Sequence, residues 1–286
     1  MAIALRLAGR WGMTFARRPS YCLYKASRCM VRACSGDFAD LRGCMSWKAD
    51  SLHFVAFGDI ASAVDSLQPW LRVFGNSPQQ LQNAPTGQQP FSTASGSVGA
   101  YQFAINSNPG RVELVLGPGQ SSSGSPEPIA DWKSALQLLV SHAVAASENM
   151  NSNRVAIVGN FSQKTANAEQ AGQIFKTQIG VKDVPERAVD LSFGFNIKKD
   201  LNDIANGMNR LCRWGTGVQK IFGMQINSTG GAPTISIQED HVAILQIDIN
   251  TAIMDFHDND LRNSIVQQLA FEVTSIVEGG YAYFIS

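Results

Sequence analysis

The sequence lacks the motifs that assign a chain to a known catalytic class. It contains no G-x-S-x-G, no H-E-x-x-H, no G-x-x-x-x-G-K-[ST] and no G-x-G-x-x-G after an expected strand. These motifs mark serine hydrolases, zinc proteases and the phosphate loops of nucleotide-binding proteins. Only four histidines occur, and they are scattered along the chain. We therefore predict no catalytic residues and no cofactor, and favour a protein that is not an enzyme.

Long apolar runs and strong charge are also missing. No apolar stretch is long enough for a secretory signal or a membrane span, so we expect a soluble, cytoplasmic protein with no membrane partner. The formal net charge is zero, but residues 1–44 carry eight Lys/Arg against two Asp, which leaves residues 45–286 with fifteen basic and twenty-one acidic residues. This mildly acidic body argues against a nucleic-acid partner.

Cysteine is nearly absent from residues 45–286, where Cys212 is the single one, while the other four lie before Met45. This distribution excludes a disulfide framework, and the spacings of Cys22, Cys29, Cys34 and Cys44 fit no common zinc pattern. The basic segment 1–44 suits an over-extended start before Met45, an organelle transit peptide, or a basic arm. We expect it to lie outside the fold, and 45–286 to form a single α+β domain with mobile loops near 75–96 and 117–128.

What the chain does contain is alternation. In His241–Asn250 one parity is apolar throughout (Ala243, Leu245, Ile247, Ile249), and the other becomes polar at Gln246, Asp248 and Asn250. A period of two places the two sets on opposite faces of a sheet. We expect a strand from Thr234 and a tight reversal at Glu239-Asp240 to precede this strand. One-sided alternation is typical of antiparallel sheets with one covered face.

Apolar residues at three- and four-residue steps predict helices within 60–74 and over 129–147, 165–180, 200–213 and 258–277. Residues 281–285 could form a short last strand. Together these elements predict an α+β fold, a mainly antiparallel sheet with amphipathic helices packed on one face. The order of elements in 154–213 leaves some parallel pairing as the alternative.

The polar parity of the expected strands is rich in uncharged hydrogen-bonding side chains. Amides both donate and accept, so such a face suits a polar neutral ligand, an extended peptide or a second copy of the same face. It also suits an ordinary wetted face in a chain with only 16% charged residues. We predict a binding or interaction protein that engages a protein partner or itself as a homo-oligomer. The candidate binding residues are Gln246, Asp248, Asn250, Gln225 and Asn196.

The alternative is a metal-dependent hydrolase built around Asp248, Asp255 and His257, because carboxylates and an imidazole close in sequence can ligate a divalent metal. The segment Asp255–Asp260 lacks the glycine and terminal glutamate of a calcium loop, and Asp258 or Asp260 has a structural explanation as a helix N-cap. We therefore predict no metal site, with Asp255 and His257 as the weak candidates. Cys212, on an expected apolar helix stripe, is predicted to be a buried, inert thiol.

Overall fold

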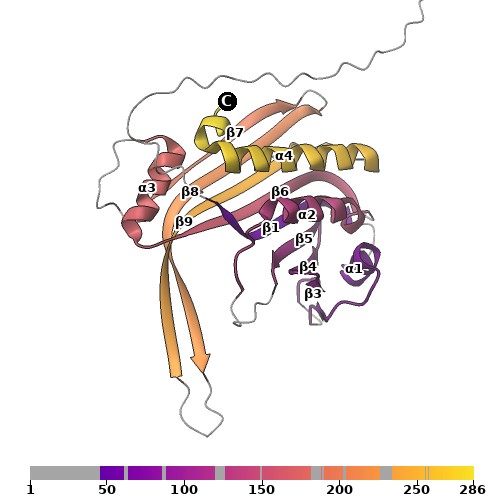
Figure 1. The fold of residues 1–286 in the computed structure, drawn as a ribbon. Coiled ribbons are helices and arrows are strands. Elements are labelled where there is room, and N and C mark those ends of the chain that lie inside the picture. The colour runs from indigo at the N-terminus through magenta and orange to yellow at the C-terminus, as the bar shows by residue number, and fades with distance from the viewer. Residues whose placement is uncertain are drawn as a thin grey trace, which may run out of the picture. The chain divides into compact units, whose positions relative to one another are not determined.

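The structure is a computed structural model that describes residues 46–60, 64–85, 88–119, 126–148, 150–181, 188, 190–201, 204–225, 234–254, 256 and 258–286. Residues Cys44–Ser286 form one compact unit. Its described part contains a nine-stranded antiparallel sheet and four helices, which confirms the predicted α+β class (Figure 1). The predictions for residues 1–44 and for half of the 117–128 connector, residues 120–125, fall outside the described residues.

All strand pairs of the sheet are antiparallel, so the alternative with parallel pairing is wrong. The strand order is β2-β3-β4-β5-β1-β6-β9-β8-β7. The strands are β1 (Lys48–Ile60), β2 (Gln80–Asn83), β3 (Ser92–Val98), β4 (Tyr101–Asn108), β5 (Arg111–Pro118), β6 (Met150–Thr165), β7 (Ser192–Leu201), β8 (Ile204–Gln225) and β9 (Thr234–Thr251). The helices are α1 (Leu67–Phe74), α2 (Trp132–Ala146), α3 (Ala168–Ile179) and α4 (Asn259–Phe284).

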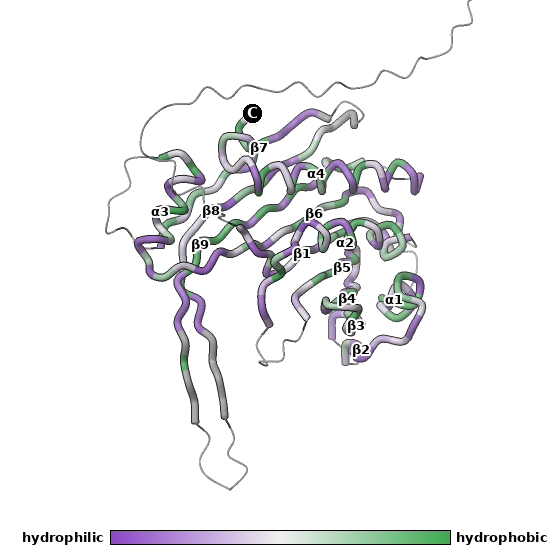
Figure 2. Tube along the Cα trace, in the orientation of Figure 1, coloured by the Kyte–Doolittle hydropathy of each residue, from purple (hydrophilic) through white to green (hydrophobic). Residues whose placement is uncertain are grey.

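The helices cover one face of the sheet. Helix α2 lies against β1 and β5, and α3 and α4 lie against β6, β8 and β9 (Figure 1). The apolar parity of each strand faces this layer: Ala243, Leu245, Ile247 and Ile249 of β9 are all at most 1% exposed, as the alternation predicted. Figure 2 shows the resulting interspersion of hydrophobic and hydrophilic residues along the strands. The opposite sheet surface, over which no described helix packs, is called the open face below.

The helix predicted over 200–213 is wrong. This segment belongs to the β7–β8 hairpin, and β8 pairs with β7 on one side and β9 on the other. Within β8, Met208, Arg210 and Cys212 are buried, whereas Leu211 is 45% exposed. The buried parity therefore contains a charged residue. Because Arg210 interrupts the apolar alternation, the apolar residues of 200–213 follow one another at three- and four-residue steps, which is the spacing typical of a helix.

The tight reversal predicted at Glu239-Asp240 is also wrong, since β9 runs through both residues without a break. Their carboxylates form ion pairs with neighbouring strands, Lys220 Nζ to Glu239 Oε1 at 2.8 Å and Lys164 Nζ to Asp240 Oδ2 at 2.7 Å. The two acids thus favour extended pairing here. Beyond His241 β9 pairs with β8 alone, as a two-stranded extension of Gln219–Gln225 and Thr234–Asp240 that projects from the sheet (Figure 1).

Two further predictions of secondary structure need correction. The range 75–96, predicted as a loop, contains β2 and most of β3. The buried residues of β3 are small, and a Cβ on Gly96 would lie 3.2 Å from the Trp70 ring, so this strand offers no apolar alternation to detect. The predicted last strand over 281–285 is instead the end of α4, which bends at Gly280 (φ 60°) and continues as helix.

Candidate functional site

The open face contains a depression of about 550 Å³ across β6, β9, β8 and β7. Strand register places two rows of residues there. One row runs Asn196–Leu211–Asp248–Val158, and the other runs Gly194–Arg213–Gln246–Asn160. These rows bring together three of the five predicted binding residues, Asn196, Gln246 and Asp248.

The other two predicted binding residues are not part of the depression. Asn250 is only 4% exposed. Its amide donates to Asp248 Oδ1 at 2.9 Å and accepts from Asn209 Nδ2 at 3.1 Å, so it positions the Asp248 carboxylate from the next position along the same face of β9. Gln225 pairs with Thr234 in the two-stranded extension, about 40 Å along β8 from Arg213 at the usual rise per residue. Gln225 therefore lies outside the depression, and its role in binding stays a prediction.

The centre of the depression is an exposed apolar side chain between two opposite charges. Leu211 is directly paired with Asp248 of β9, and Arg213 lies two residues further along β8 on the same face. In the part of the chain that the structure describes, neither Arg213 nor Asp248 forms an ion pair. Their charges are therefore available to another molecule.

Cys212 lies between Leu211 and Arg213 in sequence but points to the helix side. It is fully buried and free. Burial raises the pKa of its thiol well above the ordinary value, more than the nearby Arg210 lowers it. The prediction of a buried thiol is confirmed, on a strand instead of a helix.

A hydrogen-bonded set on β1, β5 and β6 adjoins the depression through Asn160. The Asn160 amide donates to Ser51 Oγ at 3.0 Å, and Ser51 Oγ lies 2.9 Å from Nε2 of His53. The other ring nitrogen of His53, Nδ1, lies 2.8 Å from Oε1 of Glu113. Sequence reasoning missed this set. The S-x-H spacing puts Ser51 and His53 on one face of a strand, but only the register with β5 brings Glu113 to them.

Glu113 is the acidic end of this set. Burial, the strongest single influence, would raise the pKa of its carboxyl group, but hydrogen bonds from His53 and Asn106 and the charges of His53 and Arg111 together hold the pKa below its ordinary value. Arg111 Nη2 lies 3.1 Å from the same Oε1 atom. Glu113 is therefore ionised at neutral pH and can only accept hydrogen bonds.

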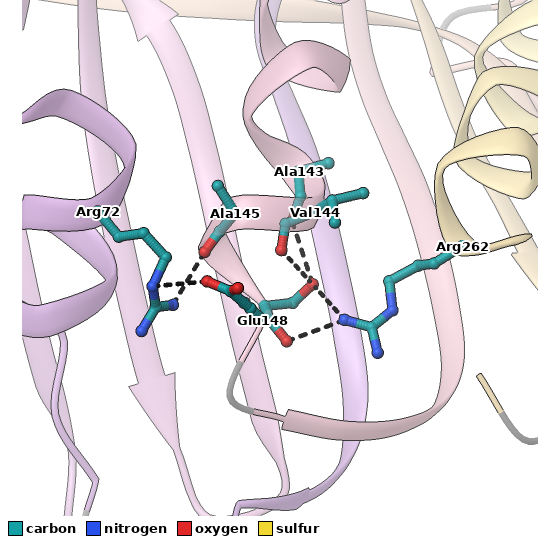
Figure 3. A network of polar contacts seen from close by, with 7 residues as sticks. Arg72, Ala143, Val144, Ala145, Glu148 and Arg262 are labelled. Atoms are coloured by element: carbon teal, nitrogen blue, oxygen red, sulfur yellow. Dashed lines mark hydrogen bonds and ion pairs between the residues drawn. The ribbon is translucent and has the colours of Figure 1, made fainter. Parts of the chain in front are cut away.

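On the helix side of the sheet, charged groups have structural partners. Figure 3 shows Arg72 of α1 and Arg262 of α4 at the C-terminal end of α2, whose last carbonyls point toward them. Arg72 donates to Ala145 O at 3.0 Å and pairs with Glu148 at 2.9 Å. Arg262 donates to Ser147 O at 3.0 Å. Cations at this position complement the negative end of the helix dipole.

A second charged cluster lies between the sheet and α4. The buried Glu272 accepts from Lys199 Nζ at 2.6 Å and from the Tyr283 hydroxyl at 3.1 Å, and its other oxygen lies 3.4 Å from Nη1 of Arg210. Arg210 also stacks over the Phe284 ring, 5.5 Å from its centroid. This cluster explains why the charged Arg210 is buried among the apolar residues on the helix side of β8.

Asp255 and His257 lie outside the described residues, so the metal-ligand prediction is untested. Among the residues that are described, no three His, Cys, Asp or Glu side chains are arranged to hold a metal ion. Within the same part of the chain, no helix combines the length and apolarity needed to cross a membrane. Comparison with models of known families, with curated proteins and with solved structures gives no match to this chain.

Proposed function

We propose that this protein is an interaction protein that self-associates through the depression on its open face. The observation that carries the proposal is Leu211, 45% exposed between Arg213 and Asp248, which form no ion pair among the described residues. A protein interface has an apolar centre and a polar rim, and Leu211 with the polar side chains around it has this arrangement on a small scale.

A second copy of the chain is the occupant that this charge pattern fits. In a symmetric dimer the same patch is used by both subunits, so it must be complementary to itself. A two-fold axis near Leu211 would pack this side chain on its equivalent and place Arg213 opposite Asp248 of the second copy. The amide of Gln246 can donate and accept, and so can pair with the same residue across the axis.

The test is the molar mass in solution, measured by size-exclusion chromatography with light scattering over a range of concentrations. We expect the unmodified chain to be a dimer and Leu211→Asp to weaken association at least about tenfold, as for a central interface residue. Phe271→Asp is the matched control, because Phe271 is 65% exposed on α4, away from the open face.

Two results would count against the proposal. A chain that is monomeric at every concentration excludes self-association. Dissociation by Phe271→Asp, with Leu211→Asp unchanged, would place the interface on the helix layer. The alternative of a metal-dependent hydrolase around Asp248, Asp255 and His257 stays a prediction, as do the cytoplasmic location and the expectation of no nucleic-acid partner.

A further inference from the structure

We propose that Ser51, His53 and Glu113 form a nucleophile, base and acid set that hydrolyses small carboxylic esters. This activity goes beyond the proposed self-association, and Ser51, His53 and Glu113 do not line the depression. The set lies on β1 and β5, and His53 is separated from Leu211 by three strand spacings, about 14 Å.

The hydrogen bonds of the set are consistent with only one arrangement of protons when His53 is neutral. Because the ionised Glu113 can only accept, Nδ1 of His53 carries the proton and donates to Oε1. Nε2 is then an acceptor, and the Ser51 hydroxyl donates to it over 2.9 Å. This is the orientation in which a histidine can remove a proton from a serine, with the carboxylate fixing the tautomer.

The set meets two further requirements of acyl transfer. Ser51 and His53 are only partly buried, and the His53 side chain is 22% exposed, so a small ester can reach them. The Asn160 amide, 3.0 Å from Ser51 Oγ, is a side-chain donor within reach of the oxygen that becomes negative when a carbonyl is attacked. Backbone N–H groups in the strand interior are used by the sheet, so this single donor predicts slow turnover and a long-lived acyl group on Ser51.

The reaction is written as two transfers. The Ser51 hydroxyl proton moves to Nε2 of His53 while Oγ forms a bond to the ester carbonyl carbon, and the carbonyl oxygen becomes an oxyanion near Asn160. The oxyanion collapses, the bond to the leaving alkoxide breaks, and His53 protonates that alkoxide. Water then attacks the acyl carbon while Nε2 of His53 takes one of its protons, the bond from that carbon to Ser51 Oγ breaks, and His53 returns the proton to Oγ, which releases the carboxylic acid and restores the Ser51 hydroxyl.

The test uses the full chain with an alkyl fluorophosphonate probe, intact-mass measurement and peptide mapping, alongside hydrolysis of p-nitrophenyl acetate. We expect a single adduct on Ser51, no adduct with Ser51→Ala, and labelling slowed about a hundredfold or more with His53→Gln, which removes the base. Ser95→Ala is the control, because Ser95 is on the same open face but pairs across strands with Ala104 and not with a histidine.

Glu113 is tested as a positioning residue. Glu113→Gln keeps the size of the side chain but no longer favours the required tautomer, so we expect kcat for p-nitrophenyl acetate to fall with little change in KM. Glu113→Asp should recover part of the loss. A purely structural role would instead change the melting temperature and leave the ratio of kcat in the two variants near one.

An unlabelled Ser51 in the folded chain, or labelling of Ser51 that His53→Gln leaves unchanged, would overturn the proposal, and mapping of the unmodified chain decides this even if Ser51→Ala fails to fold. Ser51, His53 and Glu113 do not line the depression, so labelling and self-association are measured separately on the unmodified chain. A dimer without labelling would therefore contradict this inference alone.

Discussion

The helix side of the sheet and the depression on its open face are made by the same strands, yet charged groups are paired in the first and unpaired in the second, among the described residues. On the helix side, Glu272 is buried among Arg210, Lys199 and Tyr283, so the group is neutralised within the fold. On the open face, Asp248 accepts one amide hydrogen bond, from Asn250, and has no ion pair in the described part of the chain. The difference indicates that the helix side specifies the packing of this chain, whereas the open face is available to other molecules.

The largest expected effect comes from removing the buried carboxylate. Glu272→Ala leaves Arg210, 2% exposed, without its partner, and we expect the free energy of unfolding to fall by about 3–5 kcal/mol. Asp248→Ala removes one hydrogen bond on the open face and should cost about 1 kcal/mol. Urea unfolding of both variants measures the contrast. Equal losses would show that the two faces do not differ as described.

A smaller effect is expected at the end of α2. Arg262 is 3% exposed and donates to carbonyls of Ser147, Met150 and Phe256, joining the end of α2, the start of β6 and α4. Arg262→Met should lower the free energy of unfolding by roughly 2–3 kcal/mol, because buried carbonyls lose their donor. Arg213→Met on the open face is the matched variant and should change it by no more than about 0.5 kcal/mol.

The smallest effect is a pH dependence on the helix side. His142 of α2 packs against the rings of Phe74 and Phe103, and burial lowers its pKa from the ordinary 6.5. The unfolded chain therefore binds this proton more readily, so stability is fully present above pH 6.5 and decreases as the pH falls below it. We expect the melting temperature to drop by about 2 °C between pH 7.5 and 5.5, on the order of 0.5–1 kcal/mol.

His142→Gln, which does not titrate, should flatten the melting temperature in this window. Glu113 does not interfere, because its pKa is held below its ordinary 4.5, and its contribution is lost only as the pH falls through that lower value. A pH dependence that His142→Gln leaves intact would assign the effect to another group.

The fold could be predicted from sequence wherever the buried parity was uniformly apolar. In β9 the residues from Ala243 to Ile249 alternate without exception, and their faces were predicted correctly. In β8 the same alternation includes Arg210, whose burial depends on Glu272, about sixty residues further along the chain. The sequence around Arg210 contains no information on Glu272, so the spacing of its apolar residues indicates a helix.

The candidate site was predictable to a similar extent. Gln246 and Asp248 share a strand, so their common face follows from spacing alone, and Asn196 followed from the same rule on β7. Gln225 has the correct parity but lies in the extension, because parity fixes a face and not a position along it. Glu113 meets Ser51 and His53 only through strand register, which the sequence did not specify.

The most direct test of the open face as an interface is a charge exchange between Arg213 and Asp248. Arg213→Asp and Asp248→Arg should each weaken self-association at least about tenfold, because each variant opposes like charges across the two-fold axis. Sedimentation equilibrium of an equimolar mixture should recover the dimer, since the reversed charges of one variant then face those of the other. A mixture that associates no better than either variant alone would contradict the account.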